Sequence, residues 1–107
     1  MTIITKNLSK FTKKELDHFF SIAICNKKNQ AFTFLTAPTT QSFGKILVVA
    51  SRKYGNAPER NLLKRRCKSI FFNEKLYEKK INLAIIARPL GKNYSFQELK
   101  QLLLSLF

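Results

Sequence analysis

Acidic residues, histidine and glycine are scarce in this chain of 107 residues, and their scarcity excludes several functions. Six Asp and Glu residues and a single His are scattered along the sequence, and no Ser, Thr or Cys has a recognisable activating base nearby. Only three Gly residues are present, which excludes the usual glycine-rich phosphate-binding loops. The chain by itself therefore does not look like an enzyme.

Cysteines and long apolar runs are scarce as well. Cys25 and Cys67 form neither a C-x-x-C pair nor a pair with a nearby His, so neither a disulfide framework nor a zinc site is supported. We expect both to be reduced, packed thiols. No apolar run approaches the ~20 residues that span a bilayer. The N-terminal sequence MTIITKNLSKF lacks the apolar core of a secretory signal, so we expect a cytoplasmic protein.

Basic residues dominate what is present. Twenty Lys and Arg residues against six Asp and Glu residues give a net charge of +14, and this self-repulsion favours an anionic partner. Nucleic acid and an anionic membrane surface are the candidates, and the lack of a spanning segment favours nucleic acid. Hydrophobic residues make up 45% of the chain, with 10 Phe, and the length predicts a single domain over residues 1–107.

Two capping boxes mark a first and a last helix. Thr12 with Glu15 predicts one helix start, and Ser95 with Glu98 predicts the other. The first helix has an apolar stripe at steps of three and four residues, which consists of Leu16, Phe19, Phe20 and Ala23. The inward-facing residues predicted for the last helix are Leu99, Leu102, Leu103 and Leu106.

Three segments between these helices read as strands. AFTFLTAP alternates, with Phe32 and Phe34 on one side, Thr33 and Leu35 on the other, and Pro38 at its end. KILVVAS and INLAIIA are nearly continuous apolar runs, which are typical of strands covered on both faces.

A long basic helix is predicted between the last two of these strands. Pro58 suits its first turn, and we expect the helix to run to the high seventies. Its buried stripe comprises Leu63, Cys67, Ile70 and Phe71. The order is helix, strand, strand, helix, strand, helix, with room for a further short strand around residues 24–30. This order predicts a single α/β, sandwich-like domain with one sheet packed with three helices. A strand, a crossover helix and a second strand normally form a right-handed parallel pair.

The acidic residues and the single His offer little chemistry. Glu74 and Glu78 lie one helical turn apart and allow a two-carboxylate metal site in principle. Lys75, Lys79 and Lys80 surround them, so solvated ion pairs explain the pattern better. His18 stands beside an apolar stripe and is read as a packing or surface residue rather than a general base.

The basic helix offers a surface for phosphate groups. Arg60, Lys64 and Lys68 stack one turn above another, and a surface of this kind releases counterions when it binds a nucleic-acid backbone. Arg52 and Lys53 extend it from the preceding strand end. Further polar and basic residues beside this face are Asn56, Asn61 and Arg65.

The aromatic residues have two readings. Phe20, Phe32 and Phe34 either belong to the core or line a groove where unpaired bases stack. A basic helix beside an aromatic groove fits single-stranded RNA better than duplex DNA, since duplex readout requires a helix that enters the major groove.

The stretch SRKYGNAPERNLLKRRCKSIFF resembles the signature of the bacterial ribonuclease P protein component. The matching positions are Ser51, Lys53, Gly55, Asn56, Ala57, Arg60, Asn61, Lys64, Arg65 and Phe71. The rest of the chain is similar too, with an aromatic-bearing first helix, the AFTFL strand, INLAIIARP after the basic helix, and a final SFQELKQLL helix.

The resemblance implies a small α/β domain with a left-handed βαβ crossover, against the usual rule, that binds the catalytic RNA of ribonuclease P. In this family the RNA subunit holds the Mg²⁺ ions and removes the 5′ leader of precursor tRNA, while the protein, a monomer with one copy per RNA, assists. Residues expected at the RNA subunit are Arg52, Lys53, Asn56, Arg60, Asn61, Lys64, Arg65 and Lys68. Residues expected in the leader-binding groove are Leu16, Phe20 and Phe34.

Three positions depart from the family pattern. Leu62 replaces the second Arg of an Arg-Asn-Arg core, Lys68 stands where another Arg is common, and Glu59 places an acid beside Arg60. Loss of a planar guanidinium at Leu62 weakens or rearranges one contact, and Arg66, one turn along, compensates only in part. The alternatives are a general basic RNA-binding protein such as a ribosomal component, a protein-only nuclease, and a membrane-surface peptide.

Overall fold

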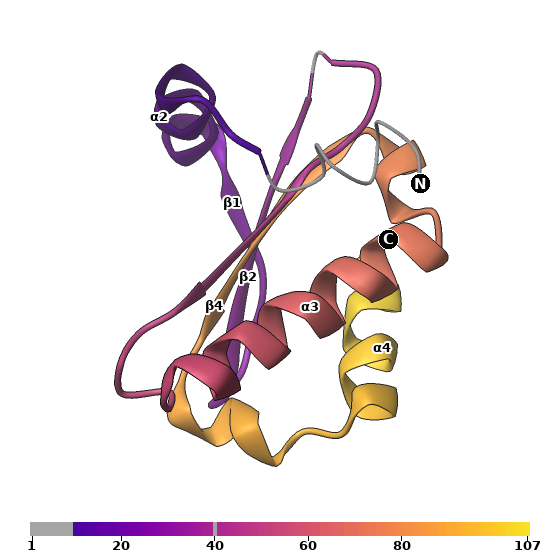
Figure 1. Ribbon diagram of the computed structural model, residues 1–107. Helices are drawn as coiled ribbons and strands as arrows, with labels where there is room; N and C mark the ends of the chain where they lie inside the picture. Colours follow the sequence, from indigo (N-terminus) through magenta and orange to yellow (C-terminus); the bar gives the residue numbers. More distant parts are fainter. Residues whose placement is uncertain (1–9, 40) are drawn as a thin grey trace.

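The computed structural model describes residues 10–39 and 41–107, which form a four-stranded mixed sheet with helices on both faces (Figure 1). The strands are β1 (Ile24–Lys28), β2 (Phe32–Pro38), β3 (Ile46–Ala50) and β4 (Ile81–Ala87). The helices are α2 (Lys13–Ile22), α3 (Ala57–Asn73) and α4 (Phe96–Leu104), with short 3₁₀ segments η1 (Leu76–Lys79) and η2 (Pro89–Asn93). The α/β fold with three helices is confirmed, as is the short strand expected around residues 24–30.

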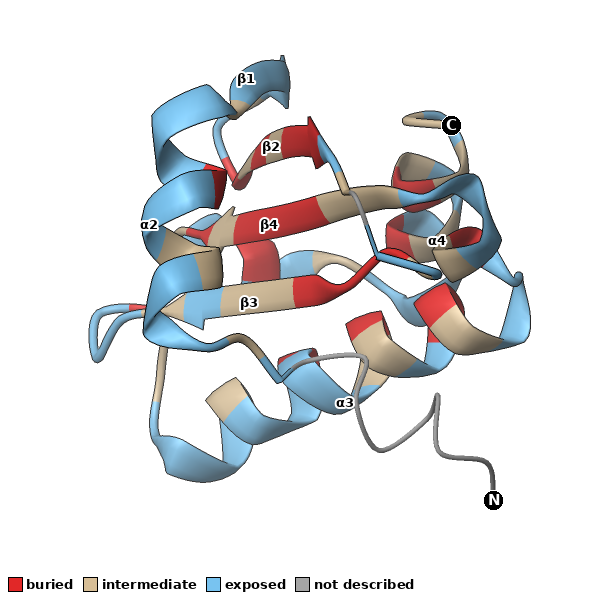
Figure 2. Cartoon of the chain, turned by 90° about the horizontal axis from the view of Figure 1, so that it is seen from above, coloured by how far each residue is buried: buried red, intermediate tan, exposed pale blue. Residues whose placement is uncertain are grey.

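The sheet order is β1-β2-β4-β3. β1 with β2 and β2 with β4 are antiparallel, whereas β3 and β4, which α3 connects, are parallel. Figure 1 shows α2 on one side of the strands, with α3 and α4 together on the other side. β1 and β3 are therefore the two edges, and β4 is an inner strand whose middle is buried (Figure 2).

The main core lies between the sheet and the pair α3 and α4. Phe32 and Phe34 of β2 project into it together, with their ring centroids 5.7 Å apart. The stripe predicted for α3, which comprises Leu63, Cys67, Ile70 and Phe71, is buried there, and α4 adds Leu99 and Leu103. The predicted apolar periodicities of α3 and α4 are thus confirmed.

A smaller cluster joins α2 to the opposite face of the sheet. Phe19 is the only residue of α2 that is buried, and it packs on Ala37 of β2 and Ala84 of β4. Leu35 and Leu47 flank this contact and are half-buried. Helix α2 is therefore attached to the sheet through a narrow apolar contact.

Each of the helices α2, α3 and α4 begins with a capping box. The boxes predicted at Thr12 and Ser95 are present, and α3 begins with a third, in which Asn56 and Glu59 exchange hydrogen bonds of 2.9 Å. Glu59 satisfies a backbone N–H at this helix start, and its negative charge lies at the positive end of the helix dipole. The presence of Glu59 beside Arg60 is thus explained by its role in the capping box of α3.

Three expectations about individual elements are wrong. Helix α3 ends at Asn73 rather than in the high seventies, because Lys75 adopts a left-handed conformation (φ 54°) that starts a separate 3₁₀ turn. β3 is not covered on both faces, because α2 reaches only one end of its face of the sheet and leaves Val49 42% exposed. Cys25 is not packed, because it lies in the exposed edge strand β1.

Cys67 behaves as predicted. It is fully buried in the core, and this burial raises the pKa of its thiol to about 12. A thiol with so high a pKa stays protonated and unreactive near neutral pH. Within residues 10–39 and 41–107, no helix has the length and apolar character needed to cross a membrane.

Candidate nucleic-acid interface

The basic side of α3 meets the edge strand β3. Lys64 and Lys68, one turn apart, line an open cavity of about 240 Å³ together with Ile46, Leu47 and Val48. Two ammonium groups beside an apolar strand edge form a surface suited to a phosphate backbone. The stacking of Lys64 and Lys68 predicted from their spacing is confirmed.

The N-terminal end of α3 extends this basic surface. The guanidinium of Arg60 donates from Nη1 to the carbonyl oxygen of Gly55 at 3.3 Å, which ties the side chain to the turn before the helix. Arg52 and Lys53 are exposed in that turn, which the hydrogen bond from the Tyr54 N–H to the Ser51 carbonyl closes. We call Arg52, Lys53, Arg60, Lys64 and Lys68 the basic face.

The two predicted asparagines differ in what they do. The side-chain oxygen of Asn56 accepts a hydrogen bond from the Glu59 N–H, so this oxygen serves the helix cap rather than a ligand. Asn61 and Arg65 lie one turn apart on α3, and both are exposed. Their positions leave them accessible beside the basic face.

Leu62 lies away from the Lys64–Lys68 cavity. It is 38% exposed and lines a second, smaller cavity of about 90 Å³ between α3, η2 and α4. Arg66 lines the same cavity, one helical turn from Leu62. The replacement of the family Arg by Leu62 therefore affects a different side of α3 from Lys64 and Lys68. On that side, Arg66 supplies a cation close to the position of the replaced Arg.

The face of the sheet that carries α2 is only partly covered. Helix α2 sits over one end, above Ala37 and Ala84 (Figure 1). At the other end, Thr33, Ile86 and Val49 are paired across β2, β4 and β3, and none of the three is buried. Side chains of directly paired residues share a face, so these three form one row.

Arg88 adds a fixed cation to this row, and it was not among the site residues predicted from the sequence. Its Nη2 donates to the carbonyl oxygen of Asn29 at 2.7 Å and to Oγ1 of Thr33 at 2.8 Å. The one signal in the sequence was a lone Arg directly after the apolar run INLAIIA. We call Thr33, Val49, Ile86 and Arg88 the open strip.

Two of the predicted groove residues lie on the side of α2 that is turned toward the open strip, because Glu15 and His18, on its other side, line a cavity with Pro38 at the far end of the sheet. Leu16 and Phe20 are one turn apart and so share a side of the helix. Leu16 is half-buried, whereas Phe20 is 51% exposed with its ring against Phe19, their centroids 5.2 Å apart. An exposed aromatic ring held by a buried one is a suitable platform for an unpaired base.

The prediction that Phe34 lies in the groove is wrong. Its side chain is fully buried and faces α3 and α4, on the opposite side of the sheet from α2. The alternation of β2 that placed Phe32 and Phe34 together was correct, and it directs Thr33 and Leu35 to the α2 side. The error lay in choosing which side of β2 faces the groove.

The acidic residues do not gather into a larger cluster within the described part of the chain. No group of three or more His, Cys, Asp or Glu side chains is close enough to hold a metal ion among those residues. Glu74 pairs instead with Lys100 of α4, at 3.5 Å between its carboxylate and the ammonium. The partner is thus Lys100 rather than the neighbouring lysines expected from the sequence, and Glu74 and Glu78 do not lie one turn apart on one helix, because α3 ends before them.

Comparison with known proteins gives a consistent result. The sequence profile of the family described as Ribonuclease P matches residues 9–107. The chain is 35% identical over 71 residues to the ribonuclease P protein component of Phytoplasma australiense, covering 63% of this chain and 59% of that protein. It is 32% identical over 71 residues to the corresponding protein of Petrotoga mobilis, covering 66% and 52%. The matched segment thus spans little more than half of these relatives.

Solved structures support the fold. The RNase P protein of Staphylococcus aureus superposes with a TM-score of 0.77 at 19% identity, covering 92% of this chain and 91% of that one. The RNase P protein from Thermotoga maritima gives a TM-score of 0.74 at 24% identity, covering 92% and 93%. Because the identities are low, these likenesses support the fold alone.

Proposed function

The chain belongs to the ribonuclease P protein family, and from this premise we propose that it is the protein subunit of a ribonucleoprotein endonuclease that removes the 5′ leader of precursor tRNA. The observation that carries the proposal is the presence of two separate RNA-compatible surfaces on one small domain. One is the basic face on α3 and the turn before it. The other consists of the open strip and the exposed ring of Phe20 on α2, which covers the neighbouring end of the same face.

The basic face is assigned to the RNA subunit. Its charges are spread over one helix and one turn, and each phosphate contact adds affinity that depends on salt but not on sequence. Asn61 and Arg65, exposed next to it, supply further donors. This surface anchors the protein and does not need to recognise individual bases.

The open strip and α2 are assigned to the leader. A single-stranded leader has unpaired bases that stack on aromatic rings, and Phe20 offers such a ring. Arg88 offers a guanidinium already oriented by Asn29 and Thr33, which lowers the entropic cost of binding a phosphate. The leader is the part of precursor tRNA that mature tRNA lacks, so contacts here favour the precursor.

The hydrolysis itself is assigned to the RNA. In this proposal Mg²⁺ ions would supply the activated water, and they would be held mainly by the RNA subunit and the substrate, as the family resemblance implies. The role of the protein is to bind and orient the two RNAs and to offset their phosphate charge.

Replacement of the exposed Phe20 ring tests whether α2 contacts the leader of precursor tRNA. In the enzyme assembled from the protein and its cognate RNA, we expect Phe20→Ala to lower affinity for precursor tRNA by about tenfold, because it removes the stacking of one base. Affinity for mature tRNA and for the RNA subunit stays unchanged. Binding of both tRNAs, measured by gel filtration or filter retention, gives the comparison.

Phe96→Ala is the matched control, because Phe96 is a similarly exposed ring (39%) at the start of α4, on the other side of the sheet. It leaves both tRNA affinities unchanged. Equal losses of precursor affinity in the two variants, or a loss of mature tRNA affinity with Phe20→Ala, would contradict the assignment of α2 to the leader.

A further inference from the structure

We propose that the ion pair between Lys45 and Glu15 is a positioning device that holds α2 over the sheet and so sets the position of Phe20 relative to the open strip, the two parts of what we call the leader surface. The inference rests on the function proposed above, since it concerns how Phe20 is placed relative to the open strip. Lys45 and Glu15 touch no part of that surface themselves. They act through the position of the helix.

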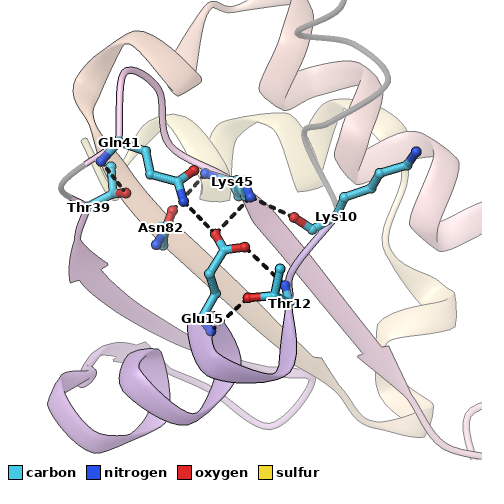
Figure 3. Close-up of polar contacts among 7 residues, drawn as sticks. All are labelled: Lys10, Thr12, Glu15, Thr39, Gln41, Lys45 and Asn82. Atoms are coloured by element: carbon cyan, nitrogen blue, oxygen red, sulfur yellow. Dashed lines mark hydrogen bonds and ion pairs between the residues drawn. The ribbon is translucent and has the colours of Figure 1, made fainter.

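The pair joins two segments that are far apart in sequence. The ammonium of Lys45 donates to Oε2 of Glu15 at 2.8 Å and to the carbonyl oxygen of Lys10 at 2.7 Å (Figure 3). Lys45 is only 8% exposed, which is unusual for a lysine in so small a domain. The ammonium also lies 5.6 Å from the centroid of the Phe11 ring. One lysine thus contacts three residues at or before the start of α2.

The backbone of Lys45 is fixed to the sheet. Its N–H donates to Oδ1 of Asn82 at 2.9 Å, and its carbonyl oxygen accepts from the N–H of Leu83 at 2.8 Å. Both partners belong to β4, an inner strand. The side chain of Lys45 therefore reaches from a rigid part of the molecule to α2.

Glu15 is equally constrained on the helix side. Its Oε1 accepts from the Thr12 N–H at 3.0 Å as part of the capping box, and its Oε2 also accepts from Nε2 of Gln41 at 2.9 Å. The hydrogen bonds from Lys45 and Thr12 lower the pKa of Glu15 to about 2. The carboxylate is therefore ionised throughout the neutral range, and the ion pair persists there.

The need for such a device follows from the weak attachment of α2. Apart from Phe19, no residue of this helix is buried, and the contact of Phe19 with Ala37 and Ala84 leaves the direction of the helix axis poorly defined. An ion pair that is largely removed from water, as this one is, gains little net stability over well-packed apolar residues, but its geometry is strict. Phe19 and the ion pair together are two points of attachment, which fix the axis of α2 and with it the place of Phe20.

The experiment uses the enzyme assembled with its cognate RNA subunit, and the readout is the ratio of precursor to mature tRNA affinity. Lys45→Met removes the charge and keeps an apolar stem, and Glu15→Gln removes the opposite charge and keeps a residue that completes the capping box. We expect each variant to lower the ratio by about fivefold, because a binding group displaced by a fraction of an ångström loses part of its contact. Affinity for the RNA subunit stays unchanged.

The matched control is Lys92→Met, which makes the same change in charge. Lys92 pairs with Glu59 at 3.8 Å, but its side chain is 41% exposed, and the pair lies at the start of α3. This control leaves the ratio unchanged.

Two further variants separate positioning from a general loss of stability. Lys45→Arg, which restores a positive charge opposite Glu15, is expected to keep the wild-type ratio of precursor to mature tRNA affinity. The double variant Lys45→Met with Glu15→Gln is expected to lower this ratio no further than either single variant does. If Lys45→Met does not fold, Glu15→Gln decides the question. A ratio of precursor to mature tRNA affinity that stays at the wild-type value in the folded single variants would overturn the positioning role. Equal losses of affinity for the RNA subunit and for precursor tRNA would overturn it as well. A wild-type protein that shows no preference for precursor tRNA would instead overturn the proposed function.

Discussion

Phe34→Ala is expected to lower the free energy of unfolding by about 3–5 kcal/mol, the usual cost of removing a fully buried Phe ring. Phe34 has no exposed surface, and its ring lies in the main core beside that of Phe32. Since domains of this size are stable by about 5–15 kcal/mol, the variant loses a large share of its stability. Chemical denaturation of the free protein measures the loss.

The same substitution at Phe20 provides the comparison. Phe20 is half exposed, so Phe20→Ala is expected to change the unfolding free energy by less than about 1 kcal/mol. If Phe34→Ala left the stability unchanged and weakened binding of precursor tRNA, Phe34 would have to lie in the leader-binding groove. That result would contradict its buried position in the main core.

Lys64→Ala combined with Lys68→Ala is expected to weaken binding of the RNA subunit by at least about tenfold near physiological salt. The two ammonium groups lie at one cavity beside β3, so both reach the same stretch of RNA backbone. Each lost phosphate contact lowers the salt dependence, so the slope of log K against log salt falls by about two. A salt titration of binding measures both quantities.

Lys13→Ala with Lys14→Ala is the matched control for this pair. Both lysines are exposed at the start of α2, and their loss lowers the net charge of +14 by the same two units, to +12. We expect the control to change affinity much less than the α3 variant. Equal effects would mean that net charge alone, rather than the basic face, binds the RNA subunit.

The sequence predicted most of the fold because its local signals agree with its long-range contacts. The capping boxes at Thr12 and Ser95 and the stripe from Leu63 to Phe71 depend on neighbours in the same helix, and all are confirmed. The end of α3 was misjudged because a left-handed residue such as Lys75 has no signature in composition. The apolar run of β3 also concealed its place at the edge of the sheet.

The candidate site was harder to predict, because it depends on which face of the sheet α2 covers. The spacing of Arg60, Lys64 and Lys68 on one helix was enough to predict a basic face. The alternation of β2 showed that Phe34 and Thr33 oppose one another, but periodicity does not tell which of them is inside. Arg88 was missed because its partners Asn29 and Thr33 are more than fifty residues away in sequence.

Cleavage of precursor tRNA at low Mg²⁺ by the cognate ribonuclease P RNA, measured with and without this protein, tests whether the protein acts as a subunit of that enzyme. We expect the protein to stimulate leader removal, an equally basic control protein to have no effect, and the protein without RNA to cleave nothing. Equal stimulation by the control protein, or no stimulation by this one, would show instead a general basic RNA-binding protein. Cleavage by the protein alone would contradict the assignment of the chemistry to the RNA.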